Sequence, residues 1–278
     1  MLNLTKAVLF GIVEGITEWL PVSSTGHMIL LEELISMDVT LEFWEMFLVV
    51  IQLGAIMAVV ILFWNQIFPF DFSKKAREEH RVMRKDIWIL WGKILIACVP
   101  AAIVGVLFDD VFDALFYNGP CVAIALIVFG IGFIVIENKN KNKAPKIDSL
   151  EKIDIKTALL IGIFQLIAAI FPGTSRSGST ILGGLMIGVS RTVAAEFTFF
   201  LAIPVMFGAS LLKILKFGLA FSGSELAILL VGTVVAFVVS ILIIKFLLGY
   251  IRKHDFKVFG WYRIALGLLV LGIFVAFG

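Results

Sequence analysis

Two apolar stretches of this 278-residue chain each contain a polar turn in mid-course: Pro21-Val22-Ser23-Ser24-Thr25-Gly26 within residues 4–31, and Pro172-Gly173-Thr174-Ser175-Arg176-Ser177-Gly178 within residues 156–187. Proline removes a backbone donor, and glycine and hydroxyl residues favour turns and helix caps. Neither stretch can therefore be one continuous helix. The sequence predicts a helix, a turn and a second helix in each.

The composition of the chain is that of a membrane protein. Hydrophobic residues make up 60% of it before glycine is counted, charged residues 16%, and the mean hydropathy is +1.06. A soluble globular protein is excluded, because average soluble domains are about 45–50% apolar even with glycine included. The net charge of +2 is too small to indicate a nucleic-acid partner.

Six further apolar runs have the length of membrane-spanning helices, since a crossing needs roughly 20 apolar residues. A turn at membrane depth must be shielded from lipid by protein or water. We therefore predict that the two interrupted stretches form re-entrant hairpins rather than additional spans. The predicted spans are residues 43–64, 88–108, 118–136, 191–215, 225–249 and 259–277.

The two interrupted stretches are related by a constant offset of 151 residues. This offset pairs Pro21 with Pro172 and Ser24 with Ser175, and it gives nine identities over the 28 positions from Ala7 to Leu34. An internal duplication is the interpretation.

We predict an all-α polytopic membrane protein with inverted-topology repeats, six spanning helices and two re-entrant helix-turn-helix hairpins in a single membrane domain over residues 1–278. Repeat one is 1–136, with hairpin 4–36 and the first three spans. A linker at 137–155 leads to repeat two, 156–278, with hairpin 156–187 and the last three spans.

Basic residues predict the orientation of the chain. If each hairpin returns to the side it came from, loops 65–87, 137–155 and 250–258 share one side and carry 14 lysines and arginines, whereas the other side has only Lys6 and Lys216. By the positive-inside rule the first side is cytoplasmic and both termini are outside. Interface aromatics then mark the cytoplasmic ends of the spans, namely Trp64, Trp88, Trp91, Trp261 and Tyr262.

Inverted repeats bring their two turns together at mid-membrane, which predicts a polar pocket there. Glu14 and Glu18 are four residues apart on one helical face of the first hairpin. Two carboxylates at membrane depth repel each other and require protons, a cation or a basic partner. The functional interpretation is a cation or substrate site; the alternative is a protonated or interfacial pair of structural value.

Arg176 is the cationic counterpart in the second turn. It lies in a run rich in hydroxyls and backbone donors that leads into a helix N-terminus. A guanidinium fork and helix amides are well suited to phosphate. The alternative is a buried Arg–Glu pair with a purely structural role.

His27 and Ser24 lie in the first turn close to the two carboxylates. His27 is a candidate general acid, base or ligand, or a satisfied core histidine. Ser24 is a nucleophile or only a hydrogen-bond donor and helix cap. Gln165 occupies the position of Glu14 in the second repeat and is predicted to hydrogen-bond within the pocket.

Glu196 either pairs with Arg191 or lines the pocket. No Walker A loop, GxGxxG, HExxH or CxxC pattern occurs, so nucleotide-driven transport and zinc hydrolysis have no support.

The two signature turns give a specific family resemblance. Residues 15–27 and 172–178 resemble the two motifs of the bacterial undecaprenyl-pyrophosphate phosphatases, the bacitracin-resistance family, and the resemblance extends over essentially the whole chain. It implies hydrolysis of undecaprenyl pyrophosphate to the monophosphate carrier lipid used in peptidoglycan synthesis, and bacitracin resistance. It also implies a bacterial plasma membrane enzyme whose active site opens to the extracytoplasmic side.

The resemblance also assigns roles to residues. It implies catalytic roles for Glu14, Glu18, Ser24, His27 and Arg176. A divalent cation, magnesium or calcium, is implied, with Glu14 and Glu18 as its hard oxygen ligands. The attacking group stays open between Ser24 and a water activated by His27 or Glu18. Flanking hydroxyls are expected to line the phosphate site, namely Ser23, Thr25, Ser175, Ser177 and Thr180.

The predicted partners are the polyprenyl pyrophosphate substrate and membrane lipids, and the assemblies compatible with the sequence include a homodimer. The alternative function is a secondary transporter or lipid flippase for an anionic substrate, because such proteins share inverted repeats and broken helices.

Overall fold

A computed structural model describes residues 2–73, 82–116, 118–218 and 220–277 of the chain. Its described residues form helices without strands, and two isolated bridges pair Phe70 with Met83 and Ile147 with Val189. The helices are α1 (Leu2–Thr17), α2 (Ser24–Leu34), α3 (Leu41–Val50), α4 (Gln52–Leu62), α5 (Trp64–Ile67), α7 (Lys85–Phe116), α8 (Gly119–Asn140), α9 (Ile155–Ile170), α10 (Arg176–Ile187), α11 (Arg191–Phe217), α12 (Gly223–Ile251) and α13 (Lys257–Phe277).

Six helical segments among the described residues are long and apolar enough to cross a membrane, which confirms the six predicted spans. They are α3 with α4 (Leu41–Leu62), α7, α8, α11, α12 and α13. The helix ends differ from the predicted ones. α7 continues to Phe116 and α8 to Asn140, four residues into the predicted linker. The length of an apolar run indicates only the part of a helix that crosses the membrane. Polar residues can extend the helix beyond that part.

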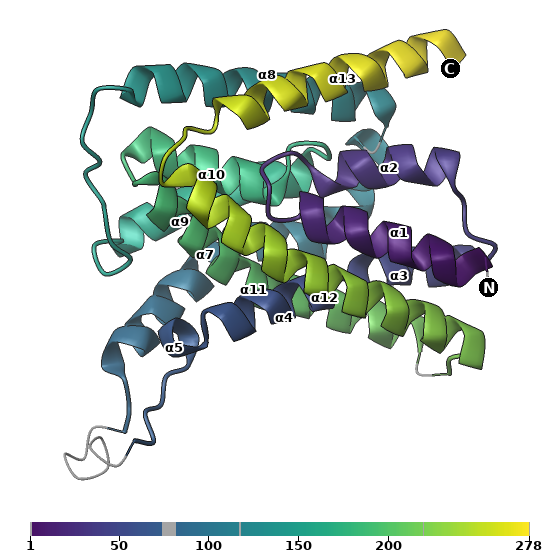
Figure 1. Ribbon diagram of the computed structural model, residues 1–278, viewed down its shortest axis with the longest axis horizontal. Coiled ribbons are helices and arrows are strands. Elements are labelled where there is room, and N and C mark those ends of the chain that lie inside the picture. The colour runs from purple at the N-terminus through teal and green to yellow at the C-terminus, as the bar shows by residue number, and fades with distance from the viewer. Residues whose placement is uncertain (1, 74–81, 117, 219, 278) are drawn as a thin grey trace.

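The two interrupted stretches are helix-turn-helix units, α1–α2 and α9–α10. Figure 1 shows α1 running inward from the N-terminus and α2 returning to the same end of the molecule. α1 packs on α12, and α9 packs on α7. Both packings use glycine: a Cβ on Gly11 would lie 2.6 Å from the Gly232 carbonyl oxygen, and one on Gly162 would collide with Ala97. Small residues allow such close helix approach in membranes.

Other helix contacts also join the first half of the chain to the second half. The first spans of the two halves meet as α3 and α4 against α11, and the third spans meet as α8 against α13. In the second pair, a Cβ on Gly130 or Gly260 would lie 2.7 Å from the other residue's carbonyl oxygen. Each hairpin therefore packs on the second span of the opposite half.

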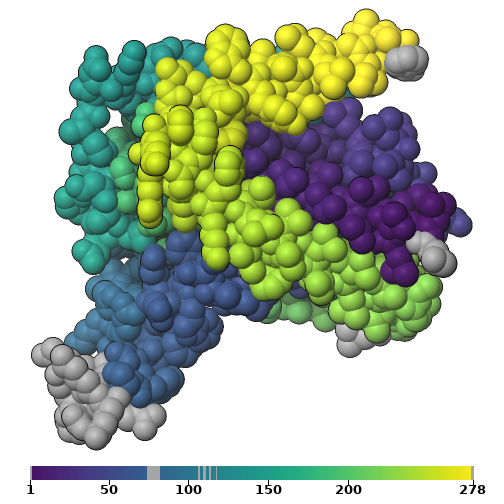
Figure 2. Space-filling view, viewed as in Figure 1, coloured from purple at the N-terminus to yellow at the C-terminus, as the bar shows by residue number. Residues whose placement is uncertain are grey.

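The basic connections lie at one end of the molecule and both chain ends at the other. In Figure 1 the segment between α8 and α9 and the α12–α13 connection are at the left, and the N and C labels are at the right. The space-filling view shows α1 and α2 reaching the surface between α12 and α13 (Figure 2). Residues 74–81 of the predicted loop 65–87 lie outside the described residues, and four of them are basic: Lys74, Lys75, Arg77 and Arg81.

Candidate active site

The two turns are built in the same way. Ser23 precedes α2 with φ of 76°, and its Oγ accepts a hydrogen bond from the Gly26 amide at 3.3 Å. Ser175 precedes α10 with φ of 67°, and its Oγ accepts one from the Gly178 amide at 3.1 Å. A serine cap satisfies one of the free amides at a helix start, while positive φ is strained for a non-glycine residue. Each turn therefore holds a strained serine that fixes the beginning of its second helix.

The equivalent caps Ser23 and Ser175 correct the alignment of the two turns that the constant offset of 151 residues gives. Ser23 and Ser175 are 152 residues apart, whereas the constant offset of 151 pairs Ser24 with Ser175. The second turn contains one residue more, which a constant offset cannot represent. Ser24 and Arg176 are consequently the equivalent residues, because each is the first residue of its helix.

Glu18 lies between these two helix starts. Ser24 Oγ donates a hydrogen bond to Glu18 Oε2 at 2.8 Å, and an Arg176 guanidinium nitrogen donates to Glu18 Oε1 at 2.8 Å. The Glu18 side chain is 7% exposed. Helix N-termini favour negative charge, so a carboxylate is stabilised at this point. The structure thus brings together three of the predicted catalytic residues, each from a different element.

Arg176 is held by protein on several sides. Its second terminal nitrogen donates to the Thr198 carbonyl at 3.0 Å, and the guanidinium carbon lies 6.0 Å from the centre of the Trp19 ring. Trp19 is fully buried and meets Phe199 edge to face at 5.2 Å between ring centres. Arg176 Nε has no partner among the described residues. The guanidinium is therefore fixed in place while one of its donors remains unused.

Glu14 is buried next to this group. Its carboxylate is 1% exposed and interacts electrostatically with Glu18 and Arg176. Glu14 Oε1 has no hydrogen-bond partner within the described ranges. The predicted hydrogen bond of Gln165 is also not formed, because both polar atoms of this buried side chain lack partners there.

Unpartnered polar atoms are concentrated at the two hairpins. Buried polar atoms are normally hydrogen-bonded, so each exception requires an explanation. Within the described part of the chain, all such side-chain atoms come from the hairpins or from one residue packed on their turns: Glu14 Oε1, Trp19 Nε1, both Gln165 atoms, Thr174 Oγ1, Arg176 Nε and Arg263 Nε. This concentration indicates a site built for a polar ligand.

His27 contacts a residue that sequence reasoning did not assign to the site. Its Nδ1 lies 2.7 Å from the Ser23 carbonyl oxygen and its Nε2 lies 2.6 Å from the Tyr262 hydroxyl. The two rings are stacked with centres 5.6 Å apart. A carbonyl can only accept, so Nδ1 carries a proton, and in the neutral imidazole Nε2 accepts from the tyrosine. Tyr262, predicted only as an interface aromatic, is therefore the partner of His27, whereas Ser24 bonds to Glu18.

The predicted phosphate-lining hydroxyls divide into two groups. Ser177 Oγ donates to the Glu18 carbonyl at 2.9 Å, and Thr180 Oγ1 donates to the Arg176 carbonyl at 2.8 Å. Ser23 and Ser175 are the helix caps. The half-buried Thr25 has no hydrogen bond from its hydroxyl to any described residue. Four of the five hydroxyls therefore already hold the two turns in shape.

Arg263 of α13 joins the two turns and was not singled out from the sequence. The residue is fully buried, and its guanidinium donates to the carbonyls of Pro21 at 3.2 Å, Gly173 at 2.9 Å and Thr174 at 2.7 Å. The available signal was its position as a lone cation within an apolar span, because ionisable residues at membrane depth are functional by default.

Arg191 does not pair with Glu196. Its guanidinium instead binds the buried Glu137 carboxylate of α8, with Nε 2.9 Å from Oε1. Arg191 and Glu196 are five residues apart on α11, and residues at this spacing do not face each other on a helix. The prediction of that pair was wrong.

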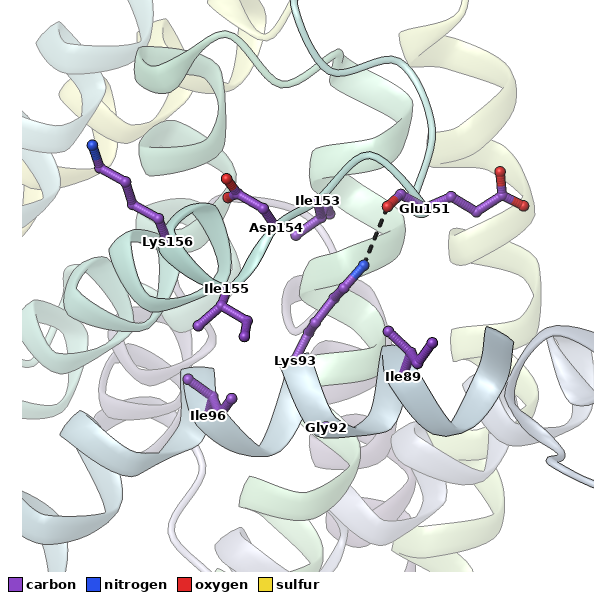
Figure 3. A pocket seen from close by; sticks show the side chains of 9 residues that line it. All are labelled: Ile89, Gly92, Lys93, Ile96, Glu151, Ile153, Asp154, Ile155 and Lys156. Carbon is purple, nitrogen blue, oxygen red and sulfur yellow. Dashed lines mark hydrogen bonds between the residues drawn. The ribbon is translucent and has the colours of Figure 1, made fainter. Parts of the chain in front are cut away.

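A surface cavity of about 580 Å³ lies away from the turns, between α7 and the segment that enters α9 (Figure 3). Lys93 Nζ donates across it to the Glu151 carbonyl at 3.2 Å.

The described residues contain no group of three or more His, Cys, Asp or Glu side chains arranged to hold a metal ion.

Comparison with known proteins agrees with the motifs. Residues 7–269 match the family described as bacitracin resistance protein BacA. The chain is 62% identical over 276 residues to an undecaprenyl-diphosphatase of Desulfitobacterium hafniense, covering 99% of this chain and 98% of that protein. It is also 62% identical to one of Acetivibrio thermocellus, with 99% of each chain covered, and 57% identical to one of Enterococcus faecalis, with 97% and 96% covered. The chain belongs to the bacitracin resistance protein BacA family.

Proposed function

We propose that this protein is a membrane phosphatase that hydrolyses undecaprenyl diphosphate to undecaprenyl phosphate and inorganic phosphate. The observation that carries the proposal is the convergence of Glu18, Ser24 and Arg176 between two helix N-termini, in a family whose compared members are named undecaprenyl-diphosphatases. The reaction regenerates the lipid carrier for peptidoglycan synthesis, which accounts for the link to bacitracin resistance.

The diphosphate binds at the two helix starts. Free amides and the helix dipole attract phosphate there, and Arg176 offers a donor, Nε, that no described residue uses. Thr25 contributes a hydroxyl at the same place, and the other predicted hydroxyls keep the turns in shape. The apolar helix surfaces beside the turns receive the polyprenyl tail. Stabilisation of the developing phosphate charge by these fixed donors supplies most of the catalysis.

Ser24 is the attacking group that the geometry supports best. Its hydroxyl donates to Glu18 Oε2, so the carboxylate can accept the proton as Oγ attacks the terminal phosphorus. The bond from this phosphorus to the bridging oxygen breaks, and undecaprenyl phosphate leaves. Water then attacks the phosphoserine, the protonated Glu18 returns its proton to the departing Ser24 Oγ, and inorganic phosphate leaves. In the alternative, a water activated by Glu18 or His27 attacks directly and no phosphoserine forms.

Glu14 and Glu18 fit a divalent cation. Glu14 Oε1 is buried without a partner among the residues that the structure describes, and magnesium is commonly held by one or two carboxylates together with substrate phosphate oxygens. When bound, the cation supplies positive charge against the diphosphate. Glu14 and Glu18 would provide its protein ligands, and Arg176 shares the neutralisation of the substrate.

The predicted inverted repeats and orientation belong to the same proposal. The exchange of partners, with α1 on α12 and α9 on α7, supports two inverted halves and re-entrant hairpins. In this proposal repeat one is 1–136, the linker 137–155 and repeat two 156–278, and α8 extends to Asn140 within that linker. Basic connections at one end support a cytoplasmic location for that end, with both termini outside and the site open to the extracytoplasmic side.

Phosphate release from undecaprenyl diphosphate by the purified full chain in detergent tests the function. We expect release that depends on magnesium and is lost in Glu18→Gln and Arg176→Ala. Glu196→Gln, which changes a carboxylate on α11 outside the turns, is the matched control and should stay active. Circular dichroism and size-exclusion chromatography establish that each variant is folded.

Two outcomes would contradict the proposal. No release from folded wild-type protein would remove the phosphatase and favour the transporter or flippase alternative. Release that survives both site variants would place the chemistry elsewhere. Rapid-quench trapping of phosphoserine, lost in Ser24→Ala, tests the nucleophile. Incorporation of oxygen-18 from water without a trapped intermediate would identify water instead.

A further inference from the structure

A second cavity of about 580 Å³ lies at the basic end of the molecule, away from the two turns. It forms where α8 and α12 end and where α10 is followed by α11. Six cationic side chains line it: Lys139, Lys141, Lys143, Lys146, Arg191 and Arg252.

Among the described residues, acidic groups do not neutralise the four lysines of this cavity. Glu137 also lines it, but its carboxylate is fully engaged by Arg191 and by the Phe256 amide, which donates to Oε1 at 3.0 Å. Glu196 interacts electrostatically with Arg252 and is not part of the lining. The four lysines have no acidic partner within the part of the chain that the structure describes. The cavity therefore attracts an anion.

The walls of the cavity are fixed by hydrogen bonds. Asn140 Nδ2 donates to the Leu185 carbonyl at 2.9 Å, which ties the end of α8 to the end of α10. The Lys146 amide donates to the Gly188 carbonyl at 2.8 Å, and the Ser190 amide donates to the Ile147 carbonyl at 2.8 Å. The segment that carries the lysines is therefore held against the α10–α11 junction, so the basic residues are presented together.

The lining and the position of the cavity indicate a lipid. Apolar side chains form part of the wall, including Leu185, Met186 and Ile251, and Met186 is 53% exposed. The cavity also lies at the ends of two spans, α8 and α12, at the level where lipid headgroups meet the hydrocarbon region. A free phosphate would use the charges alone, whereas an anionic lipid uses both the charges and the apolar wall.

We infer that this cavity binds the phosphate headgroup of an anionic phospholipid from the leaflet at the basic end of the molecule. The lysines and Arg252 surround the phosphodiester, and the apolar wall receives the beginning of an acyl chain. The site is separate from the catalytic turns, since α10 runs from Arg176 at the turn to Ile187 at the cavity. The inference does not depend on the phosphatase activity.

Lipid titration in nanodiscs tests the site. The full-length protein is placed in phosphatidylcholine discs with a rising fraction of phosphatidylglycerol, and the thermal unfolding midpoint and the lipids retained in native mass spectrometry are measured. We expect phosphatidylglycerol to raise the midpoint. The triple variant Lys139→Gln, Lys141→Gln, Lys143→Gln should bind it roughly 100-fold more weakly, because each basic residue near a membrane surface contributes about fivefold. The corresponding Lys→Arg triple variant should bind normally.

A matched control removes the same charge outside the cavity with Lys85→Gln, Lys152→Gln and Lys253→Gln. An equal loss of phosphatidylglycerol binding in this control would overturn the site in favour of diffuse surface charge. A third arm adds inorganic phosphate to protein in pure phosphatidylcholine discs. If phosphate alone raised the midpoint as much as phosphatidylglycerol, the cavity would be a free-anion site and the lipid inference would be wrong.

Discussion

Arg263 is a buried cation whose hydrogen-bond partners are backbone carbonyls. A buried charge is costly unless hydrogen bonds compensate it, and here the acceptors belong to both turns of the candidate site. Phe129 adds a ring face 5.8 Å from the guanidinium carbon. The residue therefore couples the shape of one turn to that of the other, and it has no anionic partner in the described part of the chain.

Arg263→Met should separate the two turns. We expect the loss of about 3 kcal/mol of stability, because three buried carbonyls lose a charged donor. We also expect a lower kcat for phosphate release. Arg263→Lys keeps the charge but not the fork and should be intermediate. The unfolding midpoint and kinetics in detergent measure both effects, with the exposed Lys253→Met as control. An Arg263→Met variant equal to this control would refute the coupling.

Tyr262→Phe tests the partner of His27. The change keeps the stacked ring and removes the hydroxyl that donates to Nε2. We expect kcat to fall about fivefold with a smaller effect on KM, since one hydrogen bond contributes about 1 kcal/mol. The neighbouring exposed Trp261→Phe is the control. In a His27→Ala background Tyr262→Phe should have no further effect, and an additive loss would show that the tyrosine acts independently of His27.

At the scale of single residues, the sequence predicted which residues of the turns belong to the candidate site better than it predicted their hydrogen-bond partners. Glu18, Ser24 and Arg176 could be assigned because charges and hydroxyls within apolar sequence are conspicuous. The hydrogen bond between His27 and Tyr262 joins residues 235 positions apart, and the one between Pro21 and Arg263 joins residues 242 positions apart. Local patterns contain no information about such contacts, since helix packing determines them.

Close helix crossings make particular glycines essential. A Cβ on Gly54 of α4 would collide with the Thr233 carbonyl of α12, whereas one on Gly249 of α12 would meet nothing within 4 Å. Gly54→Ala should therefore force α4 and α12 apart and destabilise the protein by about 1–3 kcal/mol. Gly249→Ala is the matched control. Denaturant unfolding in detergent measures the difference, and equal stability of the two variants would show that the crossing tolerates a side chain.

The six spans and the two hairpins were predictable, whereas the helix ends, the division of the first span into α3 and α4, and the short helix α5 were not. Apolar runs located the six spans, and proline and hydroxyl residues located the breaks between α1 and α2 and between α9 and α10. The additional residue in the second turn was hidden by the constant offset, because a repeat alignment does not detect which serine becomes the cap.

The orientation of the whole molecule can be tested by labelling. In a background with Cys98→Ala and Cys121→Ala, single cysteines are introduced by Asp38→Cys and Asn142→Cys, both at exposed positions. In intact cells a membrane-impermeant maleimide should label the first, and it should reach the second only after permeabilisation. Retained phosphate release serves as the folding control for each variant. The reverse labelling pattern would overturn the proposed topology.

The arrangement of the whole molecule followed only partly from the sequence. The duplication and the loop charges predicted that the turns of the two halves would meet, and the contact between Ser177 of one turn and Glu18 of the other agrees with this. The choice of helix partners depends on glycine crossings such as Gly130 with Gly260, which composition does not reveal.

The Arg263 bridge also has a consequence for biosynthesis. The ribosome makes the second turn 90 residues before Arg263 and the first turn 242 residues before it. At about 5–20 residues per second, synthesis of the chain from the second turn to Arg263 takes roughly 5–18 s. During translation and insertion the two strained turns are thus without their common clamp. The candidate active site reaches its final geometry only when α13 packs against the two turns. The protein therefore becomes active only after its last helix has been made and inserted.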